Sequence, residues 1–371
     1  MTFSFDSRLE FASTIPSTFY TDPNVLAQER RNIFGTTWQL VGRAEQVRQP
    51  GQYFTAEIAG EPLLIVRGND RVLRAMSNVC RHRAGPVARG EGKRPVLQCG
   101  YHGWTYSLDG RLAVTPEFDG VECFDRKDVA LPQFRIEEWH ELLFANLEPN
   151  AHSLTDYLGD LARDMPRHDH SNFRLAARKS WEVRCNWKVY VDNYLEGYHI
   201  PIVHPGLFKE LDYPNYRTET RRNYSIQFAP TKRADRIRTT SQDGEVRYFW
   251  VYPNLMLNVY PDNFSTNIIV PLSHDRTLTV FEWFFRDPED AKTKGDLAET
   301  IAFSDEIQLE DIDICEAVQR GLGSSTYTSG RYSPQRENGV HHFHSLYAEA
   351  MGVAGRRSQV PGASAKPETS S

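Results

Sequence analysis

The sequence has few cysteines, no long apolar run and no large excess of charge of either sign. Five cysteines are scattered over 371 residues, and such sparse, odd-numbered use argues against a disulfide framework and fits a reducing cytoplasm. No apolar run approaches the roughly 20 residues that a membrane-spanning helix needs, and the first residues lack the features of a secretory signal. The net charge of −6 gives no electrostatic footprint for nucleic acid. We therefore expect a cytoplasmic protein that binds neither nucleic acid nor membrane.

The chain divides into four stretches of different character. Its length predicts about two domains, each able to bury a core. Residues 20–38 predict a helix that begins near Pro23 and ends at Gly35. Short alternating runs then predict strands, and after residue 149 come a strand, a helix, more strands and one or two late helices ending at Gly321 or Gly323. We place the stretches at 1–38, 39–148, 149–350 and 351–371, the last a Gly-, Ser- and Pro-rich tail expected to be disordered.

Two cysteines and two histidines form a compact ligand set in the second stretch. Cys80 and His82 make a C-x-H motif, and Cys99 and His102 make a C-x-x-H motif. Two thiolates and two imidazoles can bind either a tetrahedral zinc or a [2Fe–2S] cluster with two histidines on one iron. One Cys and one His in each loop suit a clamp around two irons, whereas a zinc knuckle would more often repeat C-x-x-C or H-x-x-x-H. The spacing favours the cluster over zinc and over two unrelated Cys/His pairs.

A second metal site is indicated in the third stretch by His199 and His204. The two histidines are separated by Pro201 and its neighbours, and a helix followed by a turn could bring both imidazoles to one metal. Two imidazoles and one carboxylate on one face leave positions open for O₂ and substrate, as in non-haem Fe(II) oxygenases. The spacing leaves the carboxylate open.

The segment NVCRHRAGPVARGEGKRPVLQCGYHGWTYSLDGRL resembles the Rieske domain of the ring-hydroxylating oxygenase family. The resemblance implies an α+β protein with an N-terminal all-β Rieske [2Fe–2S] domain at 39–148. It also implies a C-terminal helix-grip-like catalytic domain at 149–350, with an antiparallel sheet and helices, onto which the helical segment 1–38 packs. CNWKVYVDNYLEGYH and the C-terminal third are similar to choline, glycine betaine and carnitine monooxygenases.

The resemblance supplies the missing iron ligand. LEDIDICEAVQRGL is similar to the segment whose aspartate completes the ligand set in this family, so Asp311 is the expected third ligand. Asp305 and Asp313 are its local competitors. If Asp311 faces the iron, Glu310 does not share that face of the helix.

Glu196 stands where the family has an acidic residue just before the first iron histidine. That residue accepts a hydrogen bond from a cluster histidine of a neighbouring subunit and bridges the two metal sites, which implies an electron-bridging role for Glu196. Asp192 and Asn193 would support the site from outside the ligand set. The alternative is that Glu196 only solvates a helix face.

The resemblance implies an oxidoreductase, the oxygenase component of a Rieske non-haem iron monooxygenase or dioxygenase. The chain lacks a G-x-G-x-x-G dinucleotide fingerprint after a strand, so electrons from NAD(P)H would arrive through a separate flavin or iron–sulfur reductase. They would pass from the cluster to mononuclear Fe(2+), where O₂ is activated. In the family the two metals of one subunit lie too far apart for fast transfer, which implies a head-to-tail homotrimer.

The similarity to the C-terminal details of the family suggests hydroxylation or N-demethylation of a small quaternary ammonium compound of the choline, betaine or carnitine type. An aromatic cage would hold such a cation, and strand alternation lets about half of the aromatic residues on the central strands face a pocket. The candidates, which could equally be sheet core, are Trp250, Tyr252, Tyr260 and Trp283, with Phe249 and Phe281 beside them. The alternatives are an oxygenase that hydroxylates or O-demethylates an aromatic acid, and a non-catalytic iron–sulfur electron-transfer protein.

Other conspicuous residues are expected to be structural. The aromatic residues Trp104, Tyr106, Trp187 and Tyr198 predict core packing. Because both iron sites already have ligands, a structural or surface role is expected for His341, His342 and His344. Small buried hydrophobic roles are expected for Cys123, Cys185 and Cys315.

Overall fold

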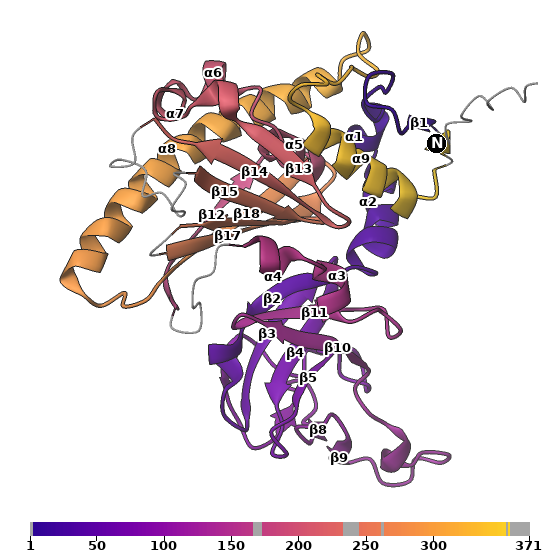
Figure 1. Ribbon diagram of the computed structural model, residues 1–371. Coiled ribbons are helices and arrows are strands. Elements are labelled where there is room, and N and C mark those ends of the chain that lie inside the picture. Colours follow the sequence, from indigo (N-terminus) through magenta and orange to yellow (C-terminus); the bar gives the residue numbers. More distant parts are fainter. Residues whose placement is uncertain (1–2, 166–172, 233–244, 261–262, 354, 357–371) are drawn as a thin grey trace, which may run out of the picture.

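The computed structural model describes residues 3–165, 173–232, 245–260, 263–353 and 355–356. Two seven-stranded antiparallel sheets dominate the molecule, and most of the helices gather around the second sheet (Figure 1). The predicted α+β class is confirmed. No helix in the described part of the chain is long and apolar enough to cross a membrane, and the predicted tail lies almost wholly outside the described residues.

The first sheet is sandwiched between two hydrophobic clusters, and its interior strand β4 (Glu61–Arg67) alternates between them. Leu63 and Ile65 pack into the cluster that continues into the second sheet, whereas Leu64 and Val66 pack toward the Cys/His loops. Because successive side chains point to opposite faces, this strand is apolar on both sides. In spatial order the strands are β2 (Gln39–Arg43), β11 (Leu142–Asn146), β10 (Gln133–Trp139), β5 (Leu73–Ser77), β4 (Glu61–Arg67), β3 (Gln52–Ile58) and β6 (Glu91–Lys93).

A small three-stranded sheet lies beyond the first sheet and holds the second Cys/His loop. Its strands are β7 (Leu97–Gln98), β8 (Thr105–Tyr106) and β9 (Leu112–Val114). The loop with Cys99 and His102 joins β7 to β8, and the loop with Cys80 and His82 follows β5. The two loops therefore come from separate hairpins of one small β module.

The second sheet is a meander closed by one early strand. In spatial order it contains β12 (Arg174–Val183), β18 (Arg276–Phe285), β17 (Asn263–Ser273), β16 (Leu255–Val259), β15 (Glu245–Val251), β14 (Tyr224–Pro230) and β13 (Arg217–Thr220). Between β12 and β13 the chain forms three helices, α5 (Trp187–Tyr194), α6 (Ile200–Val203) and α7 (Pro205–Glu210).

One long helix, α8 (Ala291–Leu322), crosses the second sheet. Leu297 and Ile301 pack against Phe281 and Trp283 of β18. The prediction of one or two helices ending at Gly321 or Gly323 is met by a single helix that ends at Leu322. The remaining helices are α1 (Thr18–Thr21), α2 (Pro23–Glu29), α3 (Leu154–Leu158), α4 (Leu161–Asp164) and α9 (Asn338–Ala350).

The predicted N-terminal helix begins at Pro23, where Asp22 caps α2 by accepting a hydrogen bond from the Asn24 amide. It continues as a π-helical turn over Arg30–Phe34 and ends at Gly35. The short strands β1 (Phe5–Asp6) and β19 (Gly355–Arg356) pair in parallel, so the two ends of the described chain lie together.

A fully buried ion pair joins α2 to α5. The Nζ of Lys188 lies 2.5 Å from Oε1 of Glu29, and neither side chain is exposed. Glu29 also accepts hydrogen bonds from Trp187 Nε1 at 2.8 Å and from the Tyr347 hydroxyl at 2.7 Å. Burial lowers the pKa of Lys188, and the Glu29 carboxylate opposes that shift. Each buried charge is therefore compensated only while the other partner is present.

Removing one partner of this pair should destabilise the fold more than replacing both. Lys188→Met leaves the Glu29 carboxylate buried without a cation and should lower the free energy of unfolding by about 3–5 kcal/mol. The double variant Glu29→Gln with Lys188→Met removes both charges but keeps an acceptor for Trp187 and Tyr347, and should recover part of that loss. Chemical denaturation of the three proteins measures the difference, and a Lys188→Met protein as stable as the parent contradicts the prediction.

Candidate metal centres

The segment from α5 to α7 is built to present two histidines. Asn186 caps α5 by accepting a hydrogen bond from the Lys188 amide at 3.0 Å, and the helix ends at Tyr194 with Leu195 as its C-cap. His199 precedes the single turn of α6 and His204 follows it. Pro201 and Pro205 lie in the first turns of α6 and α7. Proline is favoured there because the first backbone N–H groups of a helix have no partner within the helix. A Cβ at Gly197 would lie 2.6 Å from the Tyr216 ring, so only glycine fits there.

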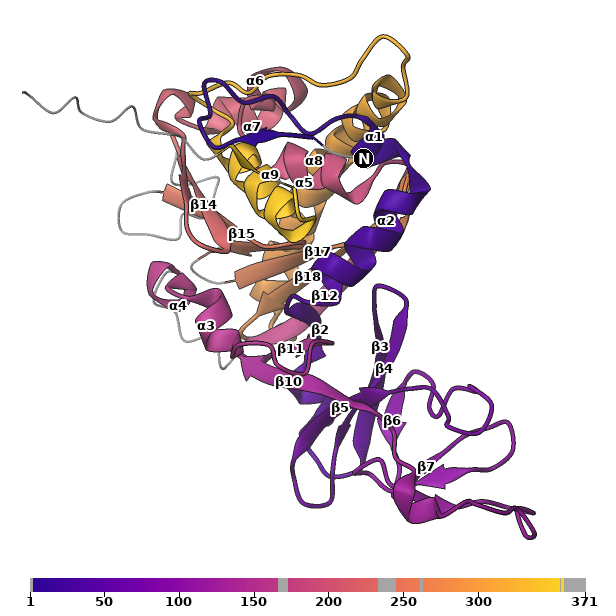
Figure 2. The same cartoon turned by 90° about the vertical axis from the view of Figure 1, so that its right-hand side faces the viewer.

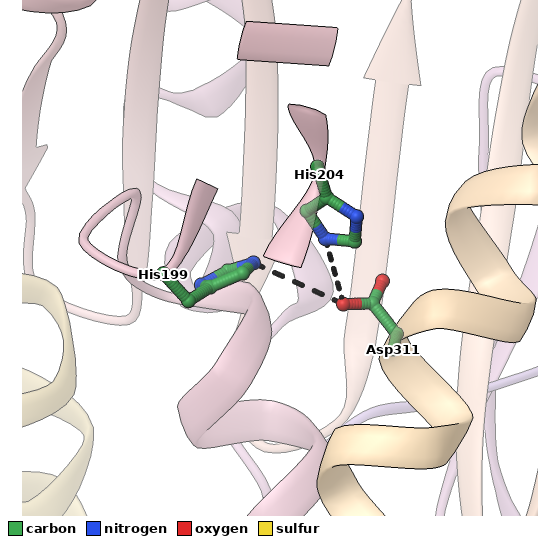
Figure 3. A group of neighbouring side chains, drawn as sticks. All are labelled: His199, His204 and Asp311. Carbon is green, nitrogen blue, oxygen red and sulfur yellow. Dashed lines mark hydrogen bonds and ion pairs between the residues drawn. The ribbon is translucent and has the colours of Figure 1, made fainter. Parts of the chain in front are cut away.

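His199, His204 and Asp311 converge on one point, although Asp311 lies on α8, far along the chain (Figure 3). Asp311 Oδ1 lies 3.0 Å from His204 Nε2 and 3.8 Å from His199 Nε2. One donor atom from each of the three residues lies within 4.8 Å of the other two. Two imidazoles and one carboxylate that approach a common point from one side are a suitable ligand set for Fe(II). The remaining coordination positions would stay open for O₂ and substrate.

The outer nitrogen of each histidine is held by a glutamate. His199 Nδ1 lies 2.7 Å from Glu196 Oε1, and His204 Nδ1 lies 2.6 Å from Glu310 Oε2. An ionised carboxylate accepts a hydrogen bond, so these two contacts favour the tautomer that carries its proton on Nδ1 and directs the Nε2 lone pair toward the triad. The Asn193 amide donates to Asp311 Oδ1 at 2.7 Å and fixes the carboxylate.

The charge around His204 favours a cation at the centre. Burial alone would lower the pKa of His204, but its hydrogen bonds to Asp311 and Glu310 outweigh burial and raise it. The same two carboxylates would stabilise a metal ion at the position that a second proton would otherwise occupy.

Glu310 was not expected to contribute, because it does not share the Asp311 face of α8. It reaches the site from outside, through the far edge of the His204 ring. The signal in the sequence is the adjacent pair Glu310 and Asp311, which can hold opposite sides of one imidazole.

The other acidic candidates lie elsewhere. Asp305 pairs with Lys179 at 2.5 Å, and Asp313 is exposed on α8. Asp192 points away from the triad and accepts hydrogen bonds from the Tyr20 hydroxyl at 2.7 Å and from His344 Nε2 at 2.9 Å. Of the two residues expected to support the site, Asn193 touches it directly and Asp192 acts on the opposite side of α5.

The two Cys/His loops have the same backbone design. In the first loop the Cys80 amide donates to Gly85 O at 2.8 Å and the Ala84 amide donates to Cys80 O at 3.0 Å. In the second, the Cys99 amide donates to Trp104 O at 2.9 Å and the Gly103 amide donates to Cys99 O at 3.1 Å. Ala84 and Gly103 both have positive φ, 56° and 74°. Each loop is thus closed by an equivalent pair of hydrogen bonds.

The ligand atoms of these loops are arranged for two irons. Cys80 and Cys99 are buried, and the rings of His82 and His102 lie 4.6 Å apart nearer the surface. A tetrahedral zinc would bring all four ligand atoms around one point. Separation into a buried thiol pair and an outer imidazole pair fits a [2Fe–2S] cluster with two histidines on one iron.

A cavity of about 580 Å³ opens from the triad. One row of its lining crosses the second sheet, with Tyr248 opposite Asn258, Asn258 opposite Ser265, and Ser265 opposite Trp283. Directly opposed residues share a face of the sheet. The row explains why Trp283 faces the cavity, and Tyr260 and Phe281 line it as well.

Two of the expected cage residues are placed elsewhere. Trp250 near the end of β15 and Tyr252 just after it lie in the core, and their rings lie 5.4 and 6.5 Å from the ring of Phe343 of α9. Phe249 points to the opposite face of the sheet. Strand alternation places Trp250 on the face of the sheet that carries the cavity, but outside the part that lines it. Tyr248, on the same face, does line the cavity and was not predicted.

The residues expected to be structural mostly are. His344 is buried and lies 2.6 Å from the Tyr332 hydroxyl, and His341 lies 3.0 Å from the backbone oxygen of Asp6. His342 is in the same helix, and burial lowers its pKa to about 4. Two expectations were wrong: Tyr198 is 57% exposed and Cys123 is exposed.

The two parts of the chain match two known protein families. Residues 37–125 match the Rieske [2Fe-2S] domain family, and residues 170–353 match the family of the ring hydroxylating alpha subunit (catalytic domain). Choline monooxygenase of Beta vulgaris, a chloroplastic protein, is 34% identical over 92% of this chain and 78% of its own length. The carnitine monooxygenase oxygenase subunit of Acinetobacter pittii is 34% identical over 92% of this chain and 95% of its own.

Solved structures give the same result. The quaternary ammonium Rieske monooxygenase CntA in complex with L-carnitine superposes with a TM-score of 0.83 at 33% identity, covering 94% of this chain and 98% of the other. Naphthalene 1,2-dioxygenase from Rhodococcus sp. superposes with a TM-score of 0.78 at 19% identity, covering 91% and 94% of the two chains, and shares the fold.

If Asp311 is the third ligand, its loss should remove one kind of iron only. Asp311→Ala should bind about two irons per chain in place of about three, because the cluster keeps its own ligands. Asp313→Ala, on the same helix, is the matched control and should keep all of its iron. Iron and acid-labile sulfide assays measure the ratio, and iron loss in the Asp313 variant would contradict the assignment.

Glu310 should set the affinity for the mononuclear ion. Glu310→Ala frees the far side of the His204 ring and should weaken iron binding about 10–100-fold. Glu310→Gln keeps an acceptor for Nδ1–H and should lose less. Competition with a chelator measures the affinity, and an unchanged value in Glu310→Ala would show that the contact does not orient the imidazole.

Proposed function

This chain belongs to the Rieske non-haem iron oxygenases of the ring-hydroxylating alpha-subunit family, and from that premise we propose that it oxidises a quaternary ammonium compound. The family makes it an oxidoreductase that uses a [2Fe–2S] cluster, a mononuclear iron, O₂ and electrons from a separate reductase. Hydroxylation or N-demethylation of a choline, betaine or carnitine type of substrate is the proposed reaction. A cytoplasmic location remains a prediction.

The observation that carries this proposal is the character of the cavity at the triad. Tyr248, Tyr260 and Trp283 contribute aromatic walls, and Glu299 and Glu306 of α8 lie at its edge. Aromatic faces and carboxylates both attract a cation, and a quaternary ammonium group has no hydrogen to donate, so cation–π contacts are its main specific attraction. The relatives named for choline and carnitine support the same class.

In the proposed mechanism, this chain's residues hold and orient the reacting groups. Dioxygen activation and C–H oxidation are what a mononuclear iron supplies at such a triad, with electrons relayed from a Rieske cluster. His199, His204 and Asp311 would bind that iron, and Cys80, His82, Cys99 and His102 would bind the cluster. Glu196 and Glu310 keep both Nδ1 protons in place, so both Nε2 atoms stay available.

We propose that electrons cross between subunits of a homotrimer. Figures 1 and 2 both show the small Rieske sheet and the α6–α7 region at opposite ends of the molecule. Ring closure by a head-to-tail interface would bring one end of each copy to the other end of the next. Tyr101 at the cluster loop is 61% exposed, and Tyr198 and Ile202 beside the triad are 57% and 85% exposed. Glu196 contacts His199 Nδ1 at 2.7 Å and stands two residues before the exposed Tyr198, which supports its bridging role.

Two alternatives have less support. An aromatic acid would bring a carboxylate into a cavity lined by carboxylates, and the likeness to naphthalene 1,2-dioxygenase extends to the fold alone. A non-catalytic electron-transfer protein is excluded, because the chain belongs to a family of oxygenases and carries its catalytic domain.

A substrate screen with the reconstituted holoenzyme tests the proposal. With a compatible reductase, NADH and O₂ consumption should rise several-fold with choline, glycine betaine or carnitine and stay at background with benzoate. Mass spectrometry should detect an oxidised or demethylated product from the same compound. Stimulation by benzoate alone would favour the aromatic-acid alternative.

A further inference from the structure

The iron site is assembled from two elements that lie far apart in the chain. His199 and His204 belong to the segment that follows α5, whereas Asp311 reaches them from α8 (Figure 3). Ligand atoms have to lie within about 0.2 Å of their preferred distances from a metal. The placement of α8 relative to α5 must therefore be fixed by side chains that bridge the two helices beside the site.

One of these bridges contacts none of the three ligands. The Tyr190 hydroxyl of α5 donates a hydrogen bond to Gln308 Oε1 of α8. Three residues later on each helix, Asn193 donates to Asp311. Residues three apart lie on one face of a helix, so the two bonds are adjacent links between α5 and α8. The Tyr190–Gln308 bond holds α8 in place independently of the ligands themselves.

Gln308 also ties α8 to the second sheet. Its Nε2 donates to Thr279 Oγ1 of β18 at 3.1 Å, and Thr279 Oγ1 donates to the backbone oxygen of Trp181 in β12 at 3.4 Å. A side-chain amide accepts through its oxygen and donates through its nitrogen, so both bonds of Gln308 can form at once. This one amide therefore fixes α8 in two directions, toward α5 and toward the sheet.

Burial keeps water away from these bonds. Tyr190, Gln308 and Thr279 are 3%, 1% and 0% exposed. A buried polar group that loses its partner cannot readily pair with water instead, and this makes the loss costly. Burial also raises the pKa of Tyr190 well above its ordinary value, so the hydroxyl keeps the proton that it donates.

We infer that Tyr190 and Gln308 are positioning residues for the iron ligand Asp311, and that their hydrogen bond holds the turn of α8 that carries the Asp311 carboxylate where iron binding requires it. Neither side chain has to touch the metal or the substrate. The inference concerns the metal site of any substrate's oxygenase and so goes beyond the proposed function. The competing explanation is that the bond only satisfies two buried polar groups and stabilises the core.

The iron affinity of two single variants tests the inference. Tyr190→Phe and Gln308→Met each remove the bond with little change in volume, and each should weaken binding of the mononuclear Fe(2+) about fivefold, as expected for one hydrogen bond. Anaerobic competition with a chromophoric chelator measures this affinity on the cluster-loaded protein. The visible spectrum of the cluster checks that the Rieske domain is intact. Unchanged affinity in both variants would overturn the inference.

Gln319→Met is the matched control, because it makes the same substitution on the same helix. Gln319 Oε1 accepts a hydrogen bond from the Asn186 amide at 2.8 Å, so it also links α8 to the beginning of α5. It lies about two helical turns beyond Asp311, and its loss should leave the iron affinity unchanged. An equal loss of affinity in Gln319→Met and Gln308→Met would mean that helix docking in general sets the site, and the inference would be wrong.

The double variant Tyr190→Phe with Gln308→Met separates positioning from stability. Each single variant leaves a buried polar group of the pair without its partner, and the double variant removes both groups. Its free energy of unfolding should therefore be closer to that of the parent than the values of the single variants are. Its iron affinity should stay about fivefold below the parent's, because the same bond is missing.

Recovery of iron affinity together with stability in the double variant would show that the bond acts only through the core, and would also overturn the inference. If Gln308→Met does not fold, the comparison of Tyr190→Phe with Gln319→Met decides the question alone.

Discussion

The register between α5 and α8 is the constraint on which the iron site depends. Polar contacts join the two helices along their length. The Arg184 side chain bonds Glu316, the Asn186 amide donates to Gln319, the Tyr190 hydroxyl donates to Gln308, and Asn193 donates to Asp311. The contacts therefore begin just before α5 and continue to its last turn. A shift of one residue along either helix would turn Asp311 by about 100° away from the histidines.

This constraint explains which parts of the site the sequence could predict. His199 and His204 sit on either side of one helical turn, and the four cluster residues occupy two short loops, so local spacing was enough to find them. Asp311 is separated from the histidines by six strands, and only resemblance to a family identified it. Glu310 was not predicted because it lies on a different face of α8 from the iron ligand Asp311. It contacts Nδ1 on the far side of the His204 ring. Such a contact depends on the position of the ring in the folded protein, which helical periodicity does not predict.

The cavity shows the same division between local and tertiary information. The strands were predicted from alternation, and alternation does fix which residues share a face. Alternation does not determine which part of a strand packs against α9 and which part faces the cavity beneath α8. Trp250 and Tyr248 share a face of β15, but only Tyr248 lines the cavity. The packing of α8 and α9 across the sheet makes that choice.

Electrostatics links the metal site to substrate choice. Asp311, Glu196 and Glu310 concentrate three carboxylates around the two histidines of the triad, and a bound Fe(2+) would offset only part of their charge. Glu299 and Glu306 of α8 add carboxylates of the same sign to the cavity lining. In a cleft with low-dielectric walls such a field is focused and not dispersed into solvent. Carboxylates that hold a divalent cation would therefore also favour a cationic substrate, and the aromatic walls of Tyr248, Tyr260 and Trp283 would act in the same direction.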